Sequence, residues 1–335
     1  MPYPLSFSPA RRGRESGFSL IELMISVTIG LGILAGLIGV LATSSSNSRT
    51  NDRTSELMTN GRYALNSMKY ELRQAGFRGY TWYADFATPA TPGALGAVTN
   101  ECLEAGATSG QFVANMRQGI WGADNSNPFQ STCIPAASYA AGNDVLMVRR
   151  VAATPTASAD LTANAVYFQS TYERGQMFRG ATPPTWSGPP APLASFQMLA
   201  YVYFVSPFTV SATETPLIPA LRRVSLNPGG VVNPAMASEL VASGIEHLQV
   251  QYGELTTAPA TQYSDTLAGS SFTPGFTQWE NVNSVRIWIL ARNVTPEPGY
   301  SNTNVYVMGN QTYDFSAAPD NFRRQLFTTV VQLRN

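Results

Sequence analysis

The sequence predicts an α+β fold, in which one long N-terminal helix packs on a domain made mainly of antiparallel β-sheet. The helix is indicated by an apolar run at residues 18–41 and by apolar residues that recur at helical spacing from there to Ala75. The sheet is indicated by short segments beyond residue 140 that are rich in β-branched and aromatic residues. The links between these segments are too short for parallel βαβ units, so antiparallel pairing is expected.

Composition favours an exported protein over a helical cytosolic enzyme. The chain has 335 residues and is 44% hydrophobic, but only 13% of its residues are charged, about half of the usual share in a soluble domain. Its 21 basic and 21 acidic side chains cancel, so no overall field attracts nucleic acid and no nucleic-acid partner is expected. Positive charge instead precedes the apolar run. Arg11, Arg12, Arg14 and Glu15 give the first 17 residues a net charge of +2 (3 − 1), as in a targeting segment.

The apolar run is long enough to cross a membrane. Its 24 residues contain no proline, and as a helix they span about 36 Å, against about 30 Å for a bilayer core. The arginines before it place the N-terminus in the cytoplasm and the later chain outside. A cleaved signal peptide ending near residues 42–44 would have a shorter apolar core. A plain anchor gives no reason for Glu22, which costs about 2.5–3.5 kcal/mol in hydrocarbon.

Residues 17–23, GFSLIEL, closely resemble the prepilin motif of type IV pilins and of the pseudopilins of type II secretion. The resemblance implies that a prepilin peptidase cuts after Gly17, which removes the leader 1–17, and that the new N-terminal Phe18 is N-methylated. The cut creates an α-ammonium beside an apolar environment, and this charge and the carboxylate of Glu22 both need partners there. We expect Glu22 to pair with the ammonium of a neighbouring subunit and so to set the axial register of a filament.

The helix is expected to continue beyond the membrane. Residues 18–41 would form its transmembrane half and residues 42–76 its amphipathic extracytoplasmic half, with Gly76 as the C-terminal cap. An apolar stripe from Leu57 to Leu72 is expected to pack on the sheet. The remaining residues, 77–335, would then make up a β-rich domain outside the membrane.

That domain is expected to begin with a long, irregular insertion at residues 80–140. The insertion is rich in Gly, Ala, Thr, Ser and Asn and contains both cysteines, Cys102 and Cys133. In an exported protein an even count suggests a disulfide, which would contribute about 3–4 kcal/mol by closing a loop of this length. Two free buried thiols are the alternative. Trp121 and Phe129 are expected to form a small core of the insertion itself, and the alternative is that they are exposed anchors for a partner.

Seven strands are expected, at residues 144–151, 165–168, 199–205, 221–226, 242–252, 282–292 and 327–333. Several of them alternate apolar and polar side chains, which is typical of half-buried strands. The segment 181–192 carries five prolines and is expected to be loop.

Sequence motifs of catalysis are missing. The only histidine, His247, lies on the polar face of an expected strand, and we expect a satisfied or solvated surface residue there. The sequence has no HExxH, GxSxG or CxxC motif, no Walker loop and no EF-hand pattern. We therefore expect no enzymatic activity, no cofactor and no metal, and assembly would draw its energy from a separate ATPase.

Five blocks of the chain resemble the PilW family of minor pilins: residues 142–150, 221–227, 239–253, 284–293 and 322–335. This resemblance implies a minor pilin that helps to prime filament assembly and forms part of the pilus tip complex. The implied partners are the prepilin peptidase, the inner membrane, the major pilin, minor pilins resembling PilV, PilX, PilE and FimU, and a PilY1-like tip protein. It also implies a single-pass inner-membrane protein with a periplasmic C-terminal domain before assembly.

Three alternatives stay open. The J-type pseudopilin of a type II secretion system has a similar architecture, and gene neighbourhood would separate it from a pilus protein. A pilus-associated adhesin would leave piliation intact when deleted. An exported hydrolase is disfavoured by the single histidine.

Overall fold

The computed structural model describes residues 17–81, 87–88, 95–186, 188, 191–227, 233–257, 260–271 and 278–334. The expected leader therefore lies outside the described residues apart from Gly17, and so do its arginines. Residues 82–86 and 89–94 of the expected insertion also lie outside them. The chain divides into two compact units, Met1–Asp52 and Arg53–Asn335, and each is described by itself.

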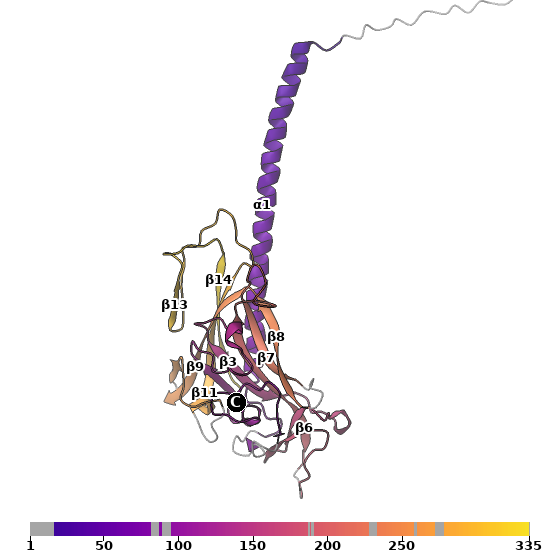
Figure 1. Cartoon of the computed structure of the whole chain (residues 1–335), viewed down its shortest axis with the longest axis vertical. Helices are drawn as coiled ribbons and strands as arrows, with labels where there is room; N and C mark the ends of the chain where they lie inside the picture. Colours follow the sequence, from indigo (N-terminus) through magenta and orange to yellow (C-terminus); the bar gives the residue numbers. More distant parts are fainter. Residues whose placement is uncertain are drawn as a thin grey trace, which may run out of the picture. The chain divides into compact units, whose positions relative to one another are not determined.

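One helix, α1 (Leu20–Leu72), runs through 53 residues and is drawn in indigo in Figure 1. It ends three residues before Ala75, the end expected from the sequence. Where it ends, the backbone bonds span three residues and not four, since the N–H of Ala75 donates to the carbonyl of Leu72 at 3.0 Å. Gly76 has a φ of 78°, the left-handed conformation of a helix C-terminal cap. Its N–H donates to the carbonyl of Arg149 at 2.9 Å, so the cap also fastens the helix end to the sheet.

In the second unit, residues 53–72 of α1 bury one face against the sheets. As the apolar stripe predicted, most buried positions follow one another at intervals of three or four residues: Leu57, Gly61, Ala64, Met68 and Leu72. Glu71 is buried as well. Gly61 marks a close approach, since a Cβ there would lie 2.2 Å from the ring of Phe327. Glu71 is paired, with its carboxylate 2.6 Å from the guanidinium of Arg150.

The larger sheet has eight strands. They are β1 (Ala87–Thr88), β2 (Ile120–Ala123), β3 (Val145–Val151), β4 (Val166–Ser170), β5 (Gly175–Arg179), β6 (Ala194–Ser206), β7 (Ala220–Asn227) and β8 (Ala235–Ser243). Their order is β1-β5-β4-β6-β3-β2, with β7 paired to β6 and β8 paired to β7. All of these pairs are antiparallel except β1 with β5, which confirms the predicted sheet type.

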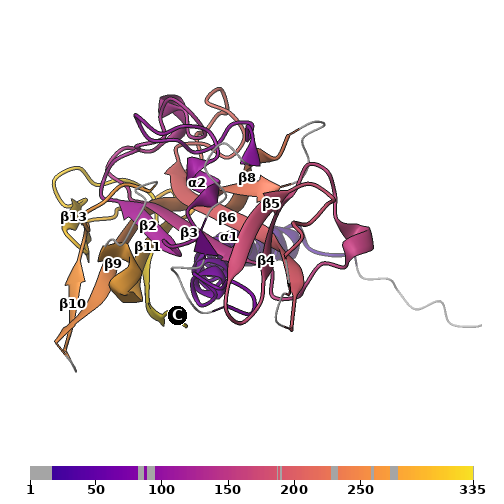
Figure 2. The same ribbon diagram turned by 90° about the horizontal axis from the view of Figure 1, so that it is seen from below.

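A second sheet has the order β10-β9-β11-β14 and is fully antiparallel. Its strands are β9 (Ile245–Thr257), β10 (Ala260–Ser264), β11 (Val282–Arg292) and β14 (Arg324–Gln332). A separate hairpin is made by β12 (Val305–Met308) and β13 (Gln311–Asp314). In Figure 2 the strands β9, β10 and β11 lie to the left and β4, β5 and β6 to the right.

Polar side chains join the two sheets where β3 begins. The Asn143 side-chain oxygen accepts the N–H of Leu248 at 2.7 Å, and the Asp144 carboxylate accepts the N–H of Val250 at 2.6 Å. The N–H of Asp144 in turn donates to the carbonyl of Leu248 at 3.0 Å. These bonds satisfy the part of β9 that β10 does not reach, so the two sheets share one continuous core.

Several expectations for the strands are corrected. The expected strand 242–252 is two strands, β8 and β9, because Gly244 turns the chain with a φ of 74°. The expected irregular insertion contributes β2, which pairs with β3 in the larger sheet, and a short helix, α2 (Gln111–Ala114). Trp121 and Phe129 are buried in the main core, so they are neither a separate core of the insertion nor exposed anchors.

Candidate assembly segment

The junction expected to be cut lies just before the helix. Gly17, Phe18 and Ser19 are not helical, and α1 begins at Leu20. The carbonyl of Ser19 accepts the first helical bond, from the N–H of Leu23 at 3.0 Å. Phe18 is 84% exposed. The peptide bond between Gly17 and Phe18 therefore lies in non-helical backbone, the form in which a protease binds its substrate.

Glu22 occupies the first turn of α1. A carboxylate there is favoured by the positive end of the helix dipole. The backbone carbonyl of Glu22 is bonded by the hydroxyl of Ser26 at 2.7 Å, while its side chain is exposed and forms no ion pair with a residue that the structure describes. The carboxylate thus lies within a few residues of Phe18 and is exposed on the first turn of the helix.

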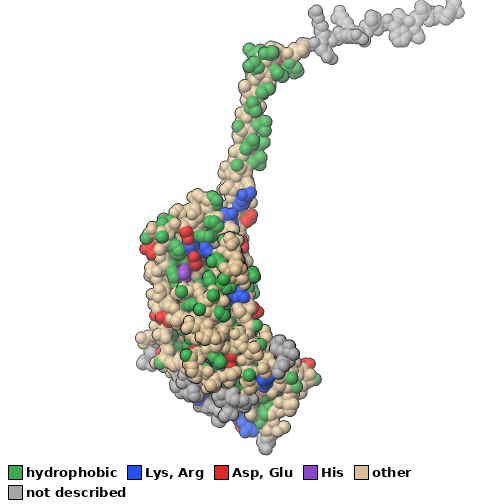
Figure 3. Space-filling view, in the orientation of Figure 1, with side chains coloured by type: hydrophobic (Ala, Val, Ile, Leu, Met, Phe, Trp, Pro, Cys, Tyr) green, Lys and Arg blue, Asp and Glu red, His purple; other side chains and the backbone are tan. Residues whose placement is uncertain are grey.

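The helix that carries Glu22 has an exposed apolar surface. Within the described residues, α1 holds the one stretch that is long and apolar enough to cross a membrane, with a mean hydropathy of 2.3 over 18 residues and none of it buried. A core helix of a soluble protein would instead be mostly buried. Figure 3 shows hydrophobic side chains, in green, along this part of the helix. A surface of this kind needs lipid or other helices around it.

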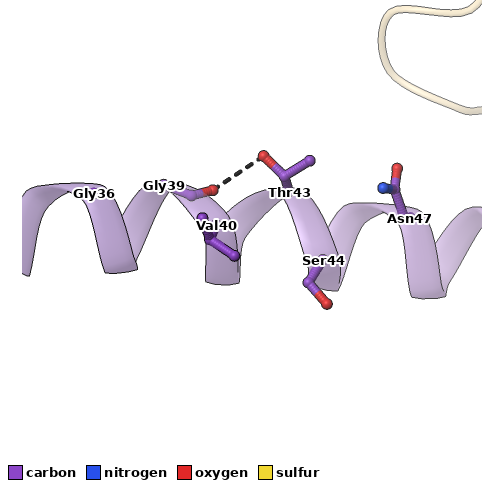
Figure 4. Close-up of a pocket in the computed structure, with 6 residues that line it drawn as sticks. All are labelled: Gly36, Gly39, Val40, Thr43, Ser44 and Asn47. Atoms are coloured by element: carbon purple, nitrogen blue, oxygen red, sulfur yellow. Dashed lines mark hydrogen bonds between the residues drawn. The ribbon is translucent and has the colours of Figure 1, made fainter.

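Small residues hollow one side of this helix. The hollow is lined by Gly36, Gly39, Val40, Thr43, Ser44 and Asn47 (Figure 4). Nothing lies within 4 Å of the Cβ position of either glycine, and the hydroxyl of Thr43 turns back to the carbonyl of Gly39 at 3.0 Å. A shallow groove of small residues admits the side chains of another helix. It does not enclose a small ligand.

Cys102 and Cys133 form the expected disulfide, with their Cα atoms 4.8 Å apart. Glu101, next to it, is buried, and its carboxylate accepts the backbone N–H groups of Gly110 at 2.5 Å and Val113 at 3.0 Å. Burial nevertheless raises the pKa of Glu101. The disulfide and Glu101 are therefore part of the buried interior of the domain.

His247 differs from the expected surface residue. The polar face of β9 is covered by the β12–β13 hairpin, and the His247 ring stacks on the ring of Tyr313 with centroids 3.7 Å apart. Burial lowers the pKa of His247 to about 4, and its Nδ1 atom has no hydrogen-bond partner among the described residues. The ring packs against Tyr313.

Asp144 is the most strongly perturbed carboxyl group of the domain. Burial raises the pKa of Asp144 to about 7, and the negative charges of Asp124 and Asp265 act in the same direction. Two backbone N–H groups, of Asn125 at 2.9 Å and Val250, oppose this shift. No group of three or more His, Cys, Asp or Glu side chains is placed to hold a metal in the described part of the chain.

Sequence reasoning missed two features that shape the domain. The buried pair of Glu71 and Arg150 joins the helix to β3, yet both residues look like ordinary charged positions in the sequence. The only available signal was that Glu71 falls within the apolar stripe of the helix. Arg324, bonded to Glu246 at 2.6 Å and to Asp320 at 2.6 Å, gave no such signal.

Comparison with protein families gives two matches. The family described as type IV pilus-assembly protein W matches residues 202–335, and the prokaryotic N-terminal methylation motif matches residues 12–42. The first match covers β7 to β14 and the last five residues of β6. The second covers the expected cleavage site, Glu22 and the apolar run. Comparison with curated proteins and with solved structures gives no match.

Proposed function

Because the chain is a PilW-like type IV minor pilin whose apolar N-terminal helix fits a membrane anchor, we propose that it primes filament assembly and forms part of the complex at the pilus tip. The observation that carries this proposal is the exposed apolar surface of α1 together with an exposed carboxylate in its first turn that forms no ion pair with any residue of 17–81 or the other described segments. Such a helix needs lipid or other helices around it.

Processing would supply the missing partner. We propose that the prepilin peptidase removes residues 1–17 and that the new amine of Phe18 is methylated. Glu22 then lies four residues from an α-ammonium, and each charge needs neutralising in an apolar setting. A bond between Glu22 of one subunit and the amine of the next satisfies both charges. It also aligns the two helices along the filament axis.

The apolar helix suggests a topology, and the resemblance to the PilW family suggests a set of partners. Residues 18–41 would lie in the inner membrane, residues 42–76 would continue outside it, and residues 77–335 would form the periplasmic domain until assembly. The major pilin, minor pilins resembling PilV, PilX, PilE and FimU, and a PilY1-like tip protein are the proposed neighbours. The role is structural, since pilin families act as filament components. The match to the pilus family over residues 202–335 favours the pilus over a secretion pseudopilus.

Deletion and complementation test this function. Cells without the gene should show at least a tenfold loss of surface pili, counted by electron microscopy, and the wild-type gene should restore them. Glu22→Ala should not restore them, although the protein is made and processed. Glu56→Ala is the matched control, because Glu56 is also an exposed helical acid but lies beyond the apolar run. Normal piliation in the deletion strain would contradict the proposal.

A further inference from the structure

The sheets of the second unit end in open edges that differ in how they are protected. Natural proteins guard such edges with charged residues, prolines or bulges, because an unguarded edge pairs with any available strand. β8 carries Glu239, which pairs with Arg223, and its ladder with β7 has a register shift between Leu221 and Arg222. β10 has a register shift as well, between Ala260 and Thr261. Both of these edges are guarded.

The edge strand β14 has none of these devices along most of its length. Residues 325–333, QLFTTVVQL, contain no charge, no proline and no glycine. The ladder between β14 and β11 runs through nine residue pairs without a register shift. The strand's one charge, Arg324, lies at its start, where its side chain is 1% exposed and bonded to Glu246 and Asp320. It cannot repel an approaching strand.

The backbone groups that face outward from β14 can be assigned from its bonds. The N–H of Asn293 donates to the carbonyl of Arg323 at 3.0 Å, and the N–H of Leu333 donates to the carbonyl of Asn283 at 2.8 Å. The backbone N–H and C=O groups of the odd-numbered residues in this segment therefore point toward β11. Because backbone groups alternate in direction along a strand, the N–H and C=O groups of the even-numbered residues point away from β11.

Three consecutive outward positions, Thr328, Val330 and Gln332, have exposed side chains. Their N–H and C=O groups have no hydrogen-bond partner among the residues that the structure describes. The next outward position, Leu326, is half-covered, since its carbonyl accepts the side-chain amide of Gln325 at 3.2 Å. The open part of the edge is thus the C-terminal half of β14.

We propose that this edge receives an extended, uncharged strand from a different subunit of the pilus. The proposal rests on the function proposed above and names one of its contact surfaces. Added strands gain affinity from main-chain hydrogen bonds and selectivity from alternate side chains. Here the partner strand would meet Thr328, Val330 and Gln332, which offer β-branched and polar but no charged contacts; the exposed Arg334 borders this stretch just beyond the end of β14. A charged side chain packed against them would lose water without gaining a counter-charge.

The size of the edge argues against a stable dimer of this chain that is held together by this edge alone. Seven paired residues, 326–332, extend about 23 Å and a sheet is about 10 Å thick, so pairing buries on the order of 500 Å² in total. A stable dimer needs about 1,200 Å² or more. The edge is therefore a local contact within a larger assembly that the helices hold together.

Variants of the full-length chain in piliated cells test the proposal. Val330→Lys places a charge on the edge, and Thr328→Pro removes one outward donor, which an edge strand tolerates in its own fold. Both should lower the amount of this protein in sheared pili at least fivefold. Val330→Thr should not. The matched control is Val305→Lys, because Val305 is 52% exposed and Val330 is 51% exposed, but Val305 lies in the β12–β13 hairpin.

A photo-crosslinking amino acid at position 330 reports the partner directly. It should form one discrete adduct with another pilus polypeptide. The yield of this adduct should be at least tenfold higher than the yield from the same amino acid at position 305. A shift between reduced and non-reduced samples shows in each variant that the disulfide has formed and the domain has folded. An adduct of two copies of this chain, or normal incorporation of folded Val330→Lys, would overturn the proposal. In that case a loss of pili on deletion would still support the general function.

Discussion

Several charged side chains inside the second unit are stabilised by a specific ion pair. Glu71 and Arg150 are the clearest pair, with side chains that are 9% and 7% exposed and a distance of 2.6 Å between carboxylate and guanidinium. A buried charge left alone is expensive, whereas a pair at the surface contributes little. Arg223 and Glu239 form such a surface pair between β7 and β8. The two pairs therefore allow a direct comparison.

We predict that Glu71→Ala lowers the free energy of unfolding by about 3–5 kcal/mol, because Arg150 stays buried without its partner. Glu239→Ala should cost about 1 kcal/mol or less. Urea unfolding of the detergent-solubilised chain, followed by the fluorescence of the buried Trp121 and Trp279, measures both. Equal effects of the two substitutions would show that the helix does not depend on this contact.

Asp144 makes the stability of the domain fall as pH rises. Its pKa is about 7 in the folded chain against 3.8 for an unperturbed aspartate. Between these values the folded state holds a proton that the unfolded state has released, so the Asp144 contribution to stability falls as pH rises from about 4 to about 7. The total effect is on the order of 4 kcal/mol.

We predict that Asp144→Asn removes this slope. Asparagine cannot accept both backbone N–H groups, so the variant is less stable at every pH, but its deficit relative to wild type should shrink as pH rises from 4 to 7. Asp160→Asn, in an exposed turn, is the control and should run parallel to wild type. The stability contribution of His247 rises with pH, because its pKa is lowered to about 4 in the folded chain and the unfolded chain therefore binds a proton more readily. This contribution is the same in wild type and in both variants. A deficit that is constant with pH would contradict the assignment.

At the scale of elements, the helix and sheet meet through a notch at Gly61. The ring of Phe327 on β14 fills the space that a side chain at position 61 would need. We predict that Gly61→Val lowers the melting temperature, with a loss of about 1–3 kcal/mol from overpacking. The double variant Gly61→Val with Phe327→Ala should recover part of this loss. A neutral single variant would mean that α1 can shift on the sheet.

The disulfide is the second element-scale test. The cysteines are separated by 31 residues, and closing a loop of that length contributes about 3–4 kcal/mol. Replacing both Cys102 and Cys133 by serine should therefore lower stability by at least that amount, because both side chains are also buried. Each single variant, Cys102→Ser or Cys133→Ser, should have a free energy of unfolding no higher than that of the double variant. An unchanged unfolding midpoint would contradict this role.

Elements with a clear hydrophobic pattern could be predicted from the sequence, whereas short strands and strands without such a pattern could not. The bounds of β11 at Val282–Arg292 match the prediction, since the segment is rich in β-branched and aromatic residues and its buried residues 285, 287 and 289 alternate with half-buried ones. β8 was merged with β9 because four of its consecutive side chains, at residues 237–240, are exposed, which leaves no alternation to detect. β2 and the β12–β13 hairpin have four residues in each strand. Their assignment depends on contacts with distant segments, which a local pattern does not contain.

The candidate site shows a similar division. The positions of Gly17, Phe18 and Glu22 follow from a short local motif, so the sequence alone predicts them. The surroundings of His247 do not, because the ring of Tyr313 that covers it is 66 positions away in the chain. The open edge of β14 was equally hidden, since it depends on which strand is last in the sheet.

At the scale of the whole molecule, the two units have different needs. The second unit buries its own hydrophobic core and pairs several of its charged side chains internally. The first presents an apolar helix with none of its membrane-length stretch buried, and a carboxylate in the first turn. That division is typical of a subunit whose domain folds alone and whose helix is completed by lipid first and by other subunits later.

The mass of the N-terminal peptide from protein purified out of the membrane and pilus fractions tests the central claim most directly. The account predicts that the peptide begins at Phe18 and carries one methyl group, and that cells without the prepilin peptidase keep residues 1–17. A chain that begins at Ser45, or one that keeps its leader in cells that possess the peptidase, would contradict it.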